Sequence, residues 1–210
     1  MKQFIFLILI LSGSIFSNAQ ASKDQLAELP DFKIVNSNGN VINIRDLANN
    51  KVAFINFWYI PCGPCFTEMS LLEKLYLKYK QDSNFIFISI TASDPKAVKS
   101  LLTRSDSDTS MHVFFKRVAQ MDTVTFPTWY LNTCMDIVTK DGAGMYDFHI
   151  TPPERKDCPY DVFKFKGYPT SFISGKNKKI LFEKTGVLTS KNDKVFKEIC
   201  DLIDALLKGK

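Results

Sequence analysis

Hydrophobic positions along the chain follow two patterns, one typical of buried strands and one typical of amphipathic helices. Residues 52–58 and 85–90 are almost continuously apolar, as expected for strands buried on both faces of a central sheet. Apolar residues recur at helical spacing over residues 64–80 and 192–207, which predicts two amphipathic helices. These four segments form the framework of the predicted fold.

Shorter sequence patterns between these four segments predict further turns, strands and a helix. Asn38-Gly39 is a strong turn signal between two short apolar stretches and predicts a hairpin. Ser93-Asp94-Pro95 is a typical helix start, and the helix is expected to reach about Arg104. Further strands are predicted at residues 112–115, 124–131 (interrupted by Pro127), 168–174 and 179–184. Because strands and helices alternate, the sequence predicts an α/β fold with helices on both faces of the sheet.

One stretch interrupts this alternation. Residues 132–166 are rich in Gly, Pro, Asp and Lys, and we interpret them as an insertion with little regular structure. Within the helix at 64–80, Glu73, Lys74 and Lys78 are expected on a solvated face.

The first residues are predicted to be a signal segment and not part of the fold. Met1-Lys2 is a short basic start, residues 4–11 are apolar, and small residues follow up to Ala19 and Ala21. This order is typical of a secretory signal, here residues 1–21, cleaved after Ala19 or Ala21. The alternative is a retained membrane anchor, although the apolar core is short for a span of about 20 residues. We therefore expect export to the periplasm or cell envelope, with residues 22–210 as the mature domain.

The composition is globular and indicates no charged partner. Of 210 residues, 45% are hydrophobic and 23% are charged, which suits one domain with a sizeable core. The net charge is +5 and the basic residues are scattered, so neither nucleic acid nor a membrane surface is an expected partner. No metal site is predicted.

The candidate chemistry lies at Cys62-Gly63-Pro64-Cys65, between a predicted buried strand and a predicted helix. A helix N-terminus favours negative charge, so the thiol of Cys62 should have a lowered pKa and act as a nucleophile. Pro64 suits the first turn of a helix, and Cys65, one turn in, would resolve a mixed disulfide on Cys62. The alternatives for such a pair are a structural disulfide or half of a zinc site, and a zinc site needs a second close pair of ligands.

The segment Phe57-Trp58-Tyr59-Ile60-Pro61-Cys62-Gly63-Pro64-Cys65 resembles the active site of thioredoxins. Together with Leu29-Pro30-Asp31-Phe32, Asn56 and Phe66-Thr67-Glu68, it resembles the exported TlpA/ResA group of thioredoxin-like reductases. The resemblance implies a thioredoxin fold with a mixed sheet of four or five strands. It also implies dithiol–disulfide exchange with protein partners and no bound cofactor. Two departures from cytosolic thioredoxins are Pro61, where an aromatic residue is usual, and Asn56, where a buried Asp is usual.

The same resemblance implies roles for residues around the cysteines. The family places a cis-proline opposite the CxxC; Pro169 fits this role better than Pro127, because strand, turn, strand and helix follow it. Glu68 would assist proton transfer to the buried thiol, although a helix-surface role remains an alternative. Trp58 is expected beside the disulfide. The expected substrate-binding residues are Trp58, Pro61, Gly63, Pro64, Tyr168 and Pro169.

The predicted function is reduction of disulfides in exported proteins, with apocytochrome c as the narrower hypothesis. The expected partners are protein disulfides and an electron donor in the membrane, and the expected state is a monomer. One alternative is a binding module that keeps the disulfide only for stability. A second is a thiol peroxidase, although peroxidases of this fold place their reactive Cys after a Thr-x-x pattern that is absent here.

Three cysteines lie outside the motif: Cys134, Cys158 and Cys200. Cys134 and Cys158 flank a stretch with few apolar anchors, and export exposes it to an oxidising compartment. We predict a structural disulfide between them, closing a loop of about 25 residues and stabilising by roughly 3–4 kcal/mol in the chain-entropy model. Cys200 is expected to be a buried, inert thiol. Mass mapping of the non-reduced protein should find the linked peptides; two free thiols at these positions would contradict the pairing.

Overall fold

The computed structural model describes residues 28–60, 62–93, 95–103, 124–131, 159–188 and 193–209. The predicted signal segment, the strand predicted at 112–115, Pro61, Cys134 and Cys158 lie outside the described residues. Within the described part, no helix has the length and apolar character needed to cross a bilayer.

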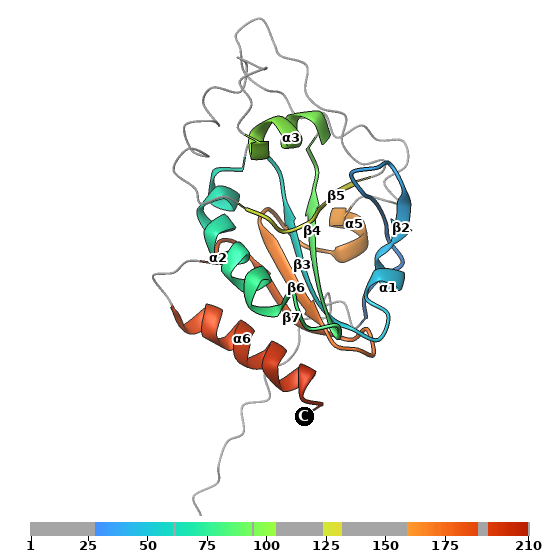
Figure 1. Cartoon of the computed structure of the whole chain (residues 1–210), viewed down its shortest axis with the longest axis vertical. Coiled ribbons are helices and arrows are strands. Elements are labelled where there is room, and N and C mark those ends of the chain that lie inside the picture. The colour runs from blue at the N-terminus through green and yellow to red at the C-terminus, as the bar shows by residue number, and fades with distance from the viewer. Residues whose placement is uncertain are drawn as a thin grey trace, which may run out of the picture.

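A mixed sheet forms the centre of the molecule (Figure 1). Its strands are β1 (Lys33–Val35), β2 (Val41–Asn43), β3 (Val52–Trp58), β4 (Phe85–Thr91), β5 (Thr128–Leu131), β6 (Thr170–Ser174) and β7 (Ile180–Thr185). In the described part of the chain they form a seven-stranded sheet in the order β2-β1-β5-β4-β3-β6-β7. β3 is parallel to β4, β4 is parallel to β5, and β6 is antiparallel to β3.

The predicted N-terminal hairpin is confirmed, and it makes the sheet wider than the family resemblance implies. β1 pairs with β2 on one side and with β5 on the other, so the hairpin extends the central strands. Gly39 has a φ of 83° in the turn, a conformation that glycine adopts at no steric cost. The expected four or five strands therefore become seven among the described residues.

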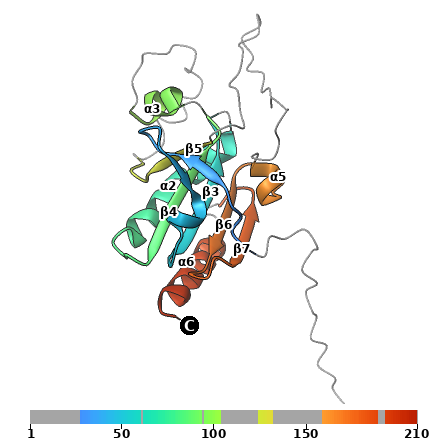
Figure 2. The ribbon, with the colours of Figure 1, turned by 90° about the vertical axis from the view of Figure 1, so that its right-hand side faces the viewer.

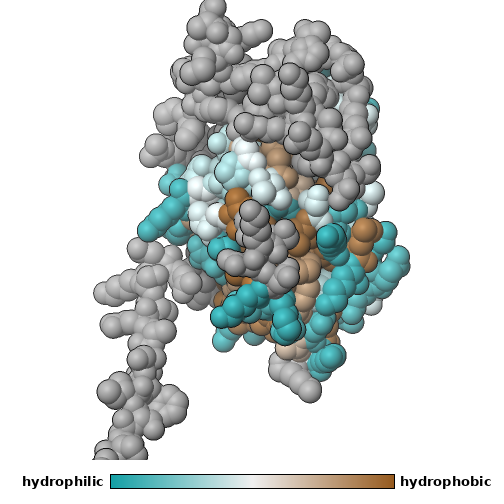
Figure 3. Space-filling view, turned by 90° about the vertical axis from the view of Figure 1, so that its left-hand side faces the viewer, coloured by the Kyte–Doolittle hydropathy of each residue, from teal (hydrophilic) through white to brown (hydrophobic). Residues whose placement is uncertain are grey.

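Helices cover both faces of the sheet, as the alternating pattern predicts. The helices are α1 (Ile44–Leu47), α2 (Gly63–Tyr79), α3 (Pro95–Thr103), α5 (Pro159–Phe163) and α6 (Asp193–Leu207). In Figures 1 and 2 the sheet separates α2 and α6 from α5. The side of the molecule that carries α2 and α6 shows hydrophilic side chains with smaller hydrophobic areas between them (Figure 3), as expected of amphipathic helices.

Alternation along β3 divides the core into two hydrophobic clusters. Phe54 and Trp58 join the cluster beneath α2, α3 and α6. Ile55 and Phe57 join the cluster beneath α1 and α5. All seven residues of β3 are buried, because successive side chains point to opposite faces and both faces are covered.

The expectation of little regular structure over residues 132–166 is wrong for the last part of that segment. α5 lies within it, and Phe163 and Phe165 are buried in the second cluster. The ring of Phe163 lies 5.3 Å from that of Phe32 and 4.8 Å from that of Phe57, measured between centroids. The end of the predicted insertion is therefore part of the core.

Glu73 is a second correction, because it lies buried and not on a solvated face. Its carboxylate accepts hydrogen bonds from the backbone N–H of Thr125 (2.7 Å), the hydroxyl of Thr125 (2.5 Å) and the N–H of Phe126 (3.3 Å). Lys74 and Lys78 on the same helix are exposed, as expected. Glu73 thus ties α2 to the segment that enters β5.

Replacing Phe163 by Ala should test whether α5 is part of the core. The side chain is fully buried among aromatic rings, so the substitution should cost about 3–5 kcal/mol of unfolding free energy in urea titration. Asp161→Ala on the exposed side of the same helix is the control, with an expected change within about 0.5 kcal/mol. Equal, small effects of both variants would contradict the packing of α5.

Candidate active site

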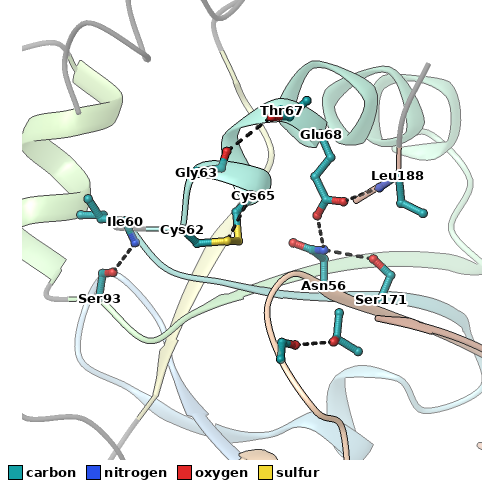
Figure 4. The surroundings of a disulfide bond; sticks show 12 residues. Asn56, Ile60, Cys62, Gly63, Cys65, Thr67, Glu68, Ser93, Ser171 and Leu188 are labelled. Atoms are coloured by element: carbon teal, nitrogen blue, oxygen red, sulfur yellow. Dashed lines mark hydrogen bonds between the residues drawn. A yellow bond between two sulfur atoms is a disulfide. The ribbon is translucent and has the colours of Figure 1, made fainter. Parts of the chain in front are cut away.

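The two motif cysteines lie at the junction of β3 and α2 and form a disulfide (Figure 4). β3 ends at Trp58, and Cys62 is the N-cap residue of α2. Pro64 stands at the start of the helix, where the absence of its N–H costs little. The predicted order of buried strand, CxxC and helix is thus confirmed.

The helix start directs a backbone donor at Cys62. The N–H of Cys65 donates to Sγ of Cys62 at 3.1 Å. The first turn of a helix also leaves N–H groups without intrahelical partners, and these favour a negative charge. Both effects would stabilise a thiolate on Cys62 when the disulfide is reduced. Cys62 is 3% exposed and Cys65 is fully buried.

Hydrogen bonds to the end of β4 hold the segment that precedes the cysteines. The N–H of Ile60 donates to the hydroxyl of Ser93 (2.8 Å), and the N–H of Ala92 donates to the carbonyl of Trp58 (3.0 Å). The indole N–H of Trp58 donates to the hydroxyl of Ser89 (2.8 Å). Trp58 is fully buried in the same cluster as both cysteines, and its ring packs edge-on against that of Phe66.

Glu68 lies one turn after Cys65 and is fully buried, which excludes the surface role left open by the sequence. One carboxylate oxygen accepts from Nδ2 of Asn56 (2.9 Å), and the other accepts from the N–H of Leu188 (2.9 Å). Burial raises the pKa of the Glu68 carboxyl to about 7, and these two hydrogen bonds oppose burial by favouring the ionised form. A carboxyl with such a pKa exchanges protons near neutral pH.

The Tyr168-Pro169 peptide bond is cis, as the family resemblance implies for this proline. Thr170, the next residue, pairs with Phe57 in the antiparallel register of β6 and β3. Pro169 therefore lies beside the end of β3 that leads to Cys62. The ring of Tyr168 lies 4.9 Å from that of Tyr59, measured between centroids. The residue before the cis-proline therefore contacts the segment that connects β3 to Cys62.

Comparisons with known proteins agree with this geometry. Residues 24–121 match the Redoxin family. The thioredoxin domain of a thiol-disulfide oxidoreductase from Bacteroides vulgatus superposes with a TM-score of 0.52 at 14% identity, covering 84% of this chain and 96% of that domain. The chain therefore has a thioredoxin-like fold.

The chain is also similar in sequence to ResA proteins, as the motif resemblance predicts. The thiol-disulfide oxidoreductase ResA of Bacillus thuringiensis (strain Al Hakam) is 34% identical over 84 residues, which cover 37% of this chain and 48% of that protein. ResA of a Bacillus cereus strain is 32% identical over 110 residues, covering 49% of this chain and 62% of that protein. The chain thus spans between about half and three-fifths of these curated relatives.

Sequence reasoning missed the roles of two residues at this site, Asn56 and Tyr160. In the sequence, Asn56 stands out only as a departure from cytosolic thioredoxins, yet its amide donates hydrogen bonds to Glu68 and Ser171. Tyr160 of α5 packs its ring 5.3 Å from that of Tyr168, although it comes from the segment predicted to be irregular. No periodic pattern marks Tyr160, whereas the position of Asn56 on a buried strand was a usable signal.

Replacing Glu68 by Gln should change how stability depends on pH. Below pH 4.5 the Glu68 carboxyl is protonated in both states; between pH 4.5 and about 7 the unfolded chain loses this proton while the folded protein keeps it. Since the folded state then binds more protons, its free energy of unfolding should fall with rising pH, by up to about 3 kcal/mol, and level off above pH 7. Glu68→Gln should abolish this fall.

Urea unfolding of the oxidised protein across this pH range measures the effect without titration of the two motif cysteines. Glu198→Gln, which removes an exposed carboxylate on α6, is the control and should keep the fall. Parallel curves for the wild type and Glu68→Gln would show that the Glu68 carboxyl does not titrate in this range.

Proposed function

We propose that this protein is a thiol–disulfide oxidoreductase that reduces disulfides of exported proteins. The observation that carries the proposal is the Cys62–Cys65 disulfide at the N-terminus of α2, with the N–H of Cys65 donating to Sγ of Cys62. A pair held only for stability would not require a buried carboxyl with a pKa near neutrality on the same helix.

The proposed exchange proceeds in two steps from the reduced protein. The thiolate of Cys62 attacks one sulfur of the substrate disulfide, a bond forms between these sulfurs, and the other substrate sulfur leaves with the electron pair. Cys65 then loses its proton to the carboxylate of Glu68 and attacks Sγ of Cys62. The bond between Cys62 and the substrate breaks, and the second substrate sulfur leaves as a thiolate. The substrate gains two electrons, and the protein ends as the disulfide seen in the structure.

The substrate would meet the surface around the motif. Pro64 is exposed, and Gly63 and Tyr168 are half-buried, so these residues offer contact area next to Cys62. The backbone of Tyr168, preceding the cis-proline Pro169, would pair with an extended substrate segment. Trp58 would support this surface from beneath, since its side chain is fully buried. Pro61 completes the proposed set from outside the described residues.

The proposed location and partners rest on the sequence. Residues 1–21 have the order of a secretory signal, and the similarity to ResA suits a reductase of the cell envelope. The narrower proposal is that the substrate is apocytochrome c, that a membrane protein returns electrons to the cysteines, and that the chain acts as a monomer without a cofactor.

Replacing the two cysteines separately should divide the reaction into its steps. Cys62→Ala should reduce insulin disulfides no faster than the uncatalysed reaction with dithiothreitol, because no attacking thiolate remains. Cys65→Ala should form mixed disulfides that persist, because no resolving thiol remains. Cys200→Ala removes a buried thiol on α6 and is the control, with activity close to that of the wild type. A Cys62→Ala variant with most of the wild-type activity would refute the assignment, and an inactive wild type would favour the binding-module alternative.

The same Cys65→Ala variant identifies the partner. Expressed in the exported compartment, it should hold its substrates through Cys62, and mass spectrometry of the non-reduced complexes names them. Capture of apocytochrome c would support the narrower proposal, and capture of other exported proteins alone would contradict it.

A further inference from the structure

Asn56 carries an unexplained polar atom directly beneath the redox pair. The residue lies in the middle of β3, is fully buried, and faces α2 together with Phe54 and Trp58. Both protons of its amide are used, since Nδ2 donates to Oε1 of Glu68 (2.9 Å) and to the hydroxyl of Ser171 (3.0 Å). The oxygen of the same amide, Oδ1, is buried and accepts no hydrogen bond within the described part of the chain. Buried carbonyl oxygens are rarely left without a donor.

The surrounding contacts fix the orientation of the amide. Above pH 7 the carboxylate of Glu68 is ionised and only accepts hydrogen bonds, so in that state the NH₂ group of Asn56 faces Glu68. The other oxygen of Glu68 is held by the N–H of Leu188, which restrains the carboxylate from rotating away. With Nδ2 fixed in this way, Oδ1 must point in the opposite direction. Figure 4 shows the oxygen end of the amide on the side of the Cys62–Cys65 disulfide, with the nitrogen end toward Glu68 and Ser171.

Reduction of the disulfide would supply a candidate donor for Oδ1, the thiol of Cys65. In the disulfide, the sulfur of Cys65 carries no hydrogen and cannot donate. Cleavage of the disulfide by a dithiol transfers two electrons and two protons across the S–S bond, and one proton comes to rest on Cys65. Cys65 is fully buried and lies three residues before Glu68, on the side of α2 that Asn56 faces. Of the other described cysteines, Cys62 lies at the N-cap of α2, and Cys200 lies at the other end of that helix, where the hydroxyl of Tyr79 donates to its carbonyl.

We propose that Oδ1 of Asn56 accepts a hydrogen bond from the thiol of Cys65 in the reduced protein. This inference rests on the proposed exchange between Cys62 and Cys65, and it assigns Asn56 a part in that exchange. A single amide then contacts the resolving thiol through its oxygen and the carboxylate of Glu68 through its nitrogen. The hydrogen bond favours the neutral thiol, which keeps Cys65 protonated until Glu68 takes its proton.

The S–H stretching band of Cys65 tests the contact directly, because hydrogen bonding lowers its frequency. In the Cys62→Ala variant Cys65 is a thiol, and the infrared difference between this variant and Cys62→Ala/Cys65→Ala isolates its band. The expected band lies below that of an alkyl thiol in apolar solvent. Adding Asn56→Leu, which has a similar shape and no acceptor, should shift it upward to the free-thiol position. Adding Ser171→Ala is the control: it leaves Oδ1 and the bond to Glu68 in place, so the band should stay low.

Two results would overturn the proposal: a Cys65 band at the free-thiol frequency while Asn56 is present, or a low band that persists in Asn56→Leu. The first needs no change at Asn56, so it decides the matter even where the Asn56→Leu variant fails to fold. Insulin reduction by the wild type is measured separately. A lowered S–H band in a protein that reduces no insulin would refute the proposed function and keep the contact. A free band in an active protein would refute the contact and keep the function.

Discussion

The burial of β3 on both faces and both edges is the constraint on which the rest of the structure depends. All seven of its residues are buried, and it pairs with β4 on one side and β6 on the other. Such a strand has almost no freedom to move, and it ends at Trp58, whose backbone and indole are bonded to residues at the end of β4. The position of Cys62 follows from this fixed end, and so does the position of the cis-proline directly before the neighbouring strand β6.

The rigid strand β3 also fixes the positions of polar groups that lie beneath the first turns of α2. Asn56 projects from the middle of the strand toward Glu68 and Ser171, at the edge of a cluster of aromatic and aliphatic side chains. Its bond to Glu68 joins the sheet to the helix, and Leu188 adds a backbone donor from the segment after β7. Three parts of the chain that are distant in sequence therefore set the protonation of one carboxyl. Because the group is cut off from water, its environment is determined by these few contacts and not by solvent.

The strongest local patterns predicted the fold well, whereas long-range contacts escaped prediction. The apolar run of β3 and the helical spacing of apolar residues in α2 are enough to predict these two elements. The family resemblance correctly favours Pro169 over Pro127 as the cis-proline. The role of Glu68 stayed open because its second partner, Leu188, lies 120 residues away in sequence. Glu73 was predicted on a solvated face from its charge, since nothing local shows that the backbone before β5 covers it. α5 escaped prediction because five residues among Gly, Pro and Asp give no detectable period.

The packing of α5 also bears on how such a protein can diversify. Phe163 holds this helix to the core, while Tyr160 and Phe165 place their rings against Tyr168, next to the cis-proline. Part of the structure beside the cis-proline is thus formed by α5 and the residues that follow it, which lie outside the strand–CxxC–helix unit. Mutations there can remodel which partners fit while the sulfur chemistry stays unchanged. Evolution can in this way vary recognition and reactivity as separate traits within one small domain.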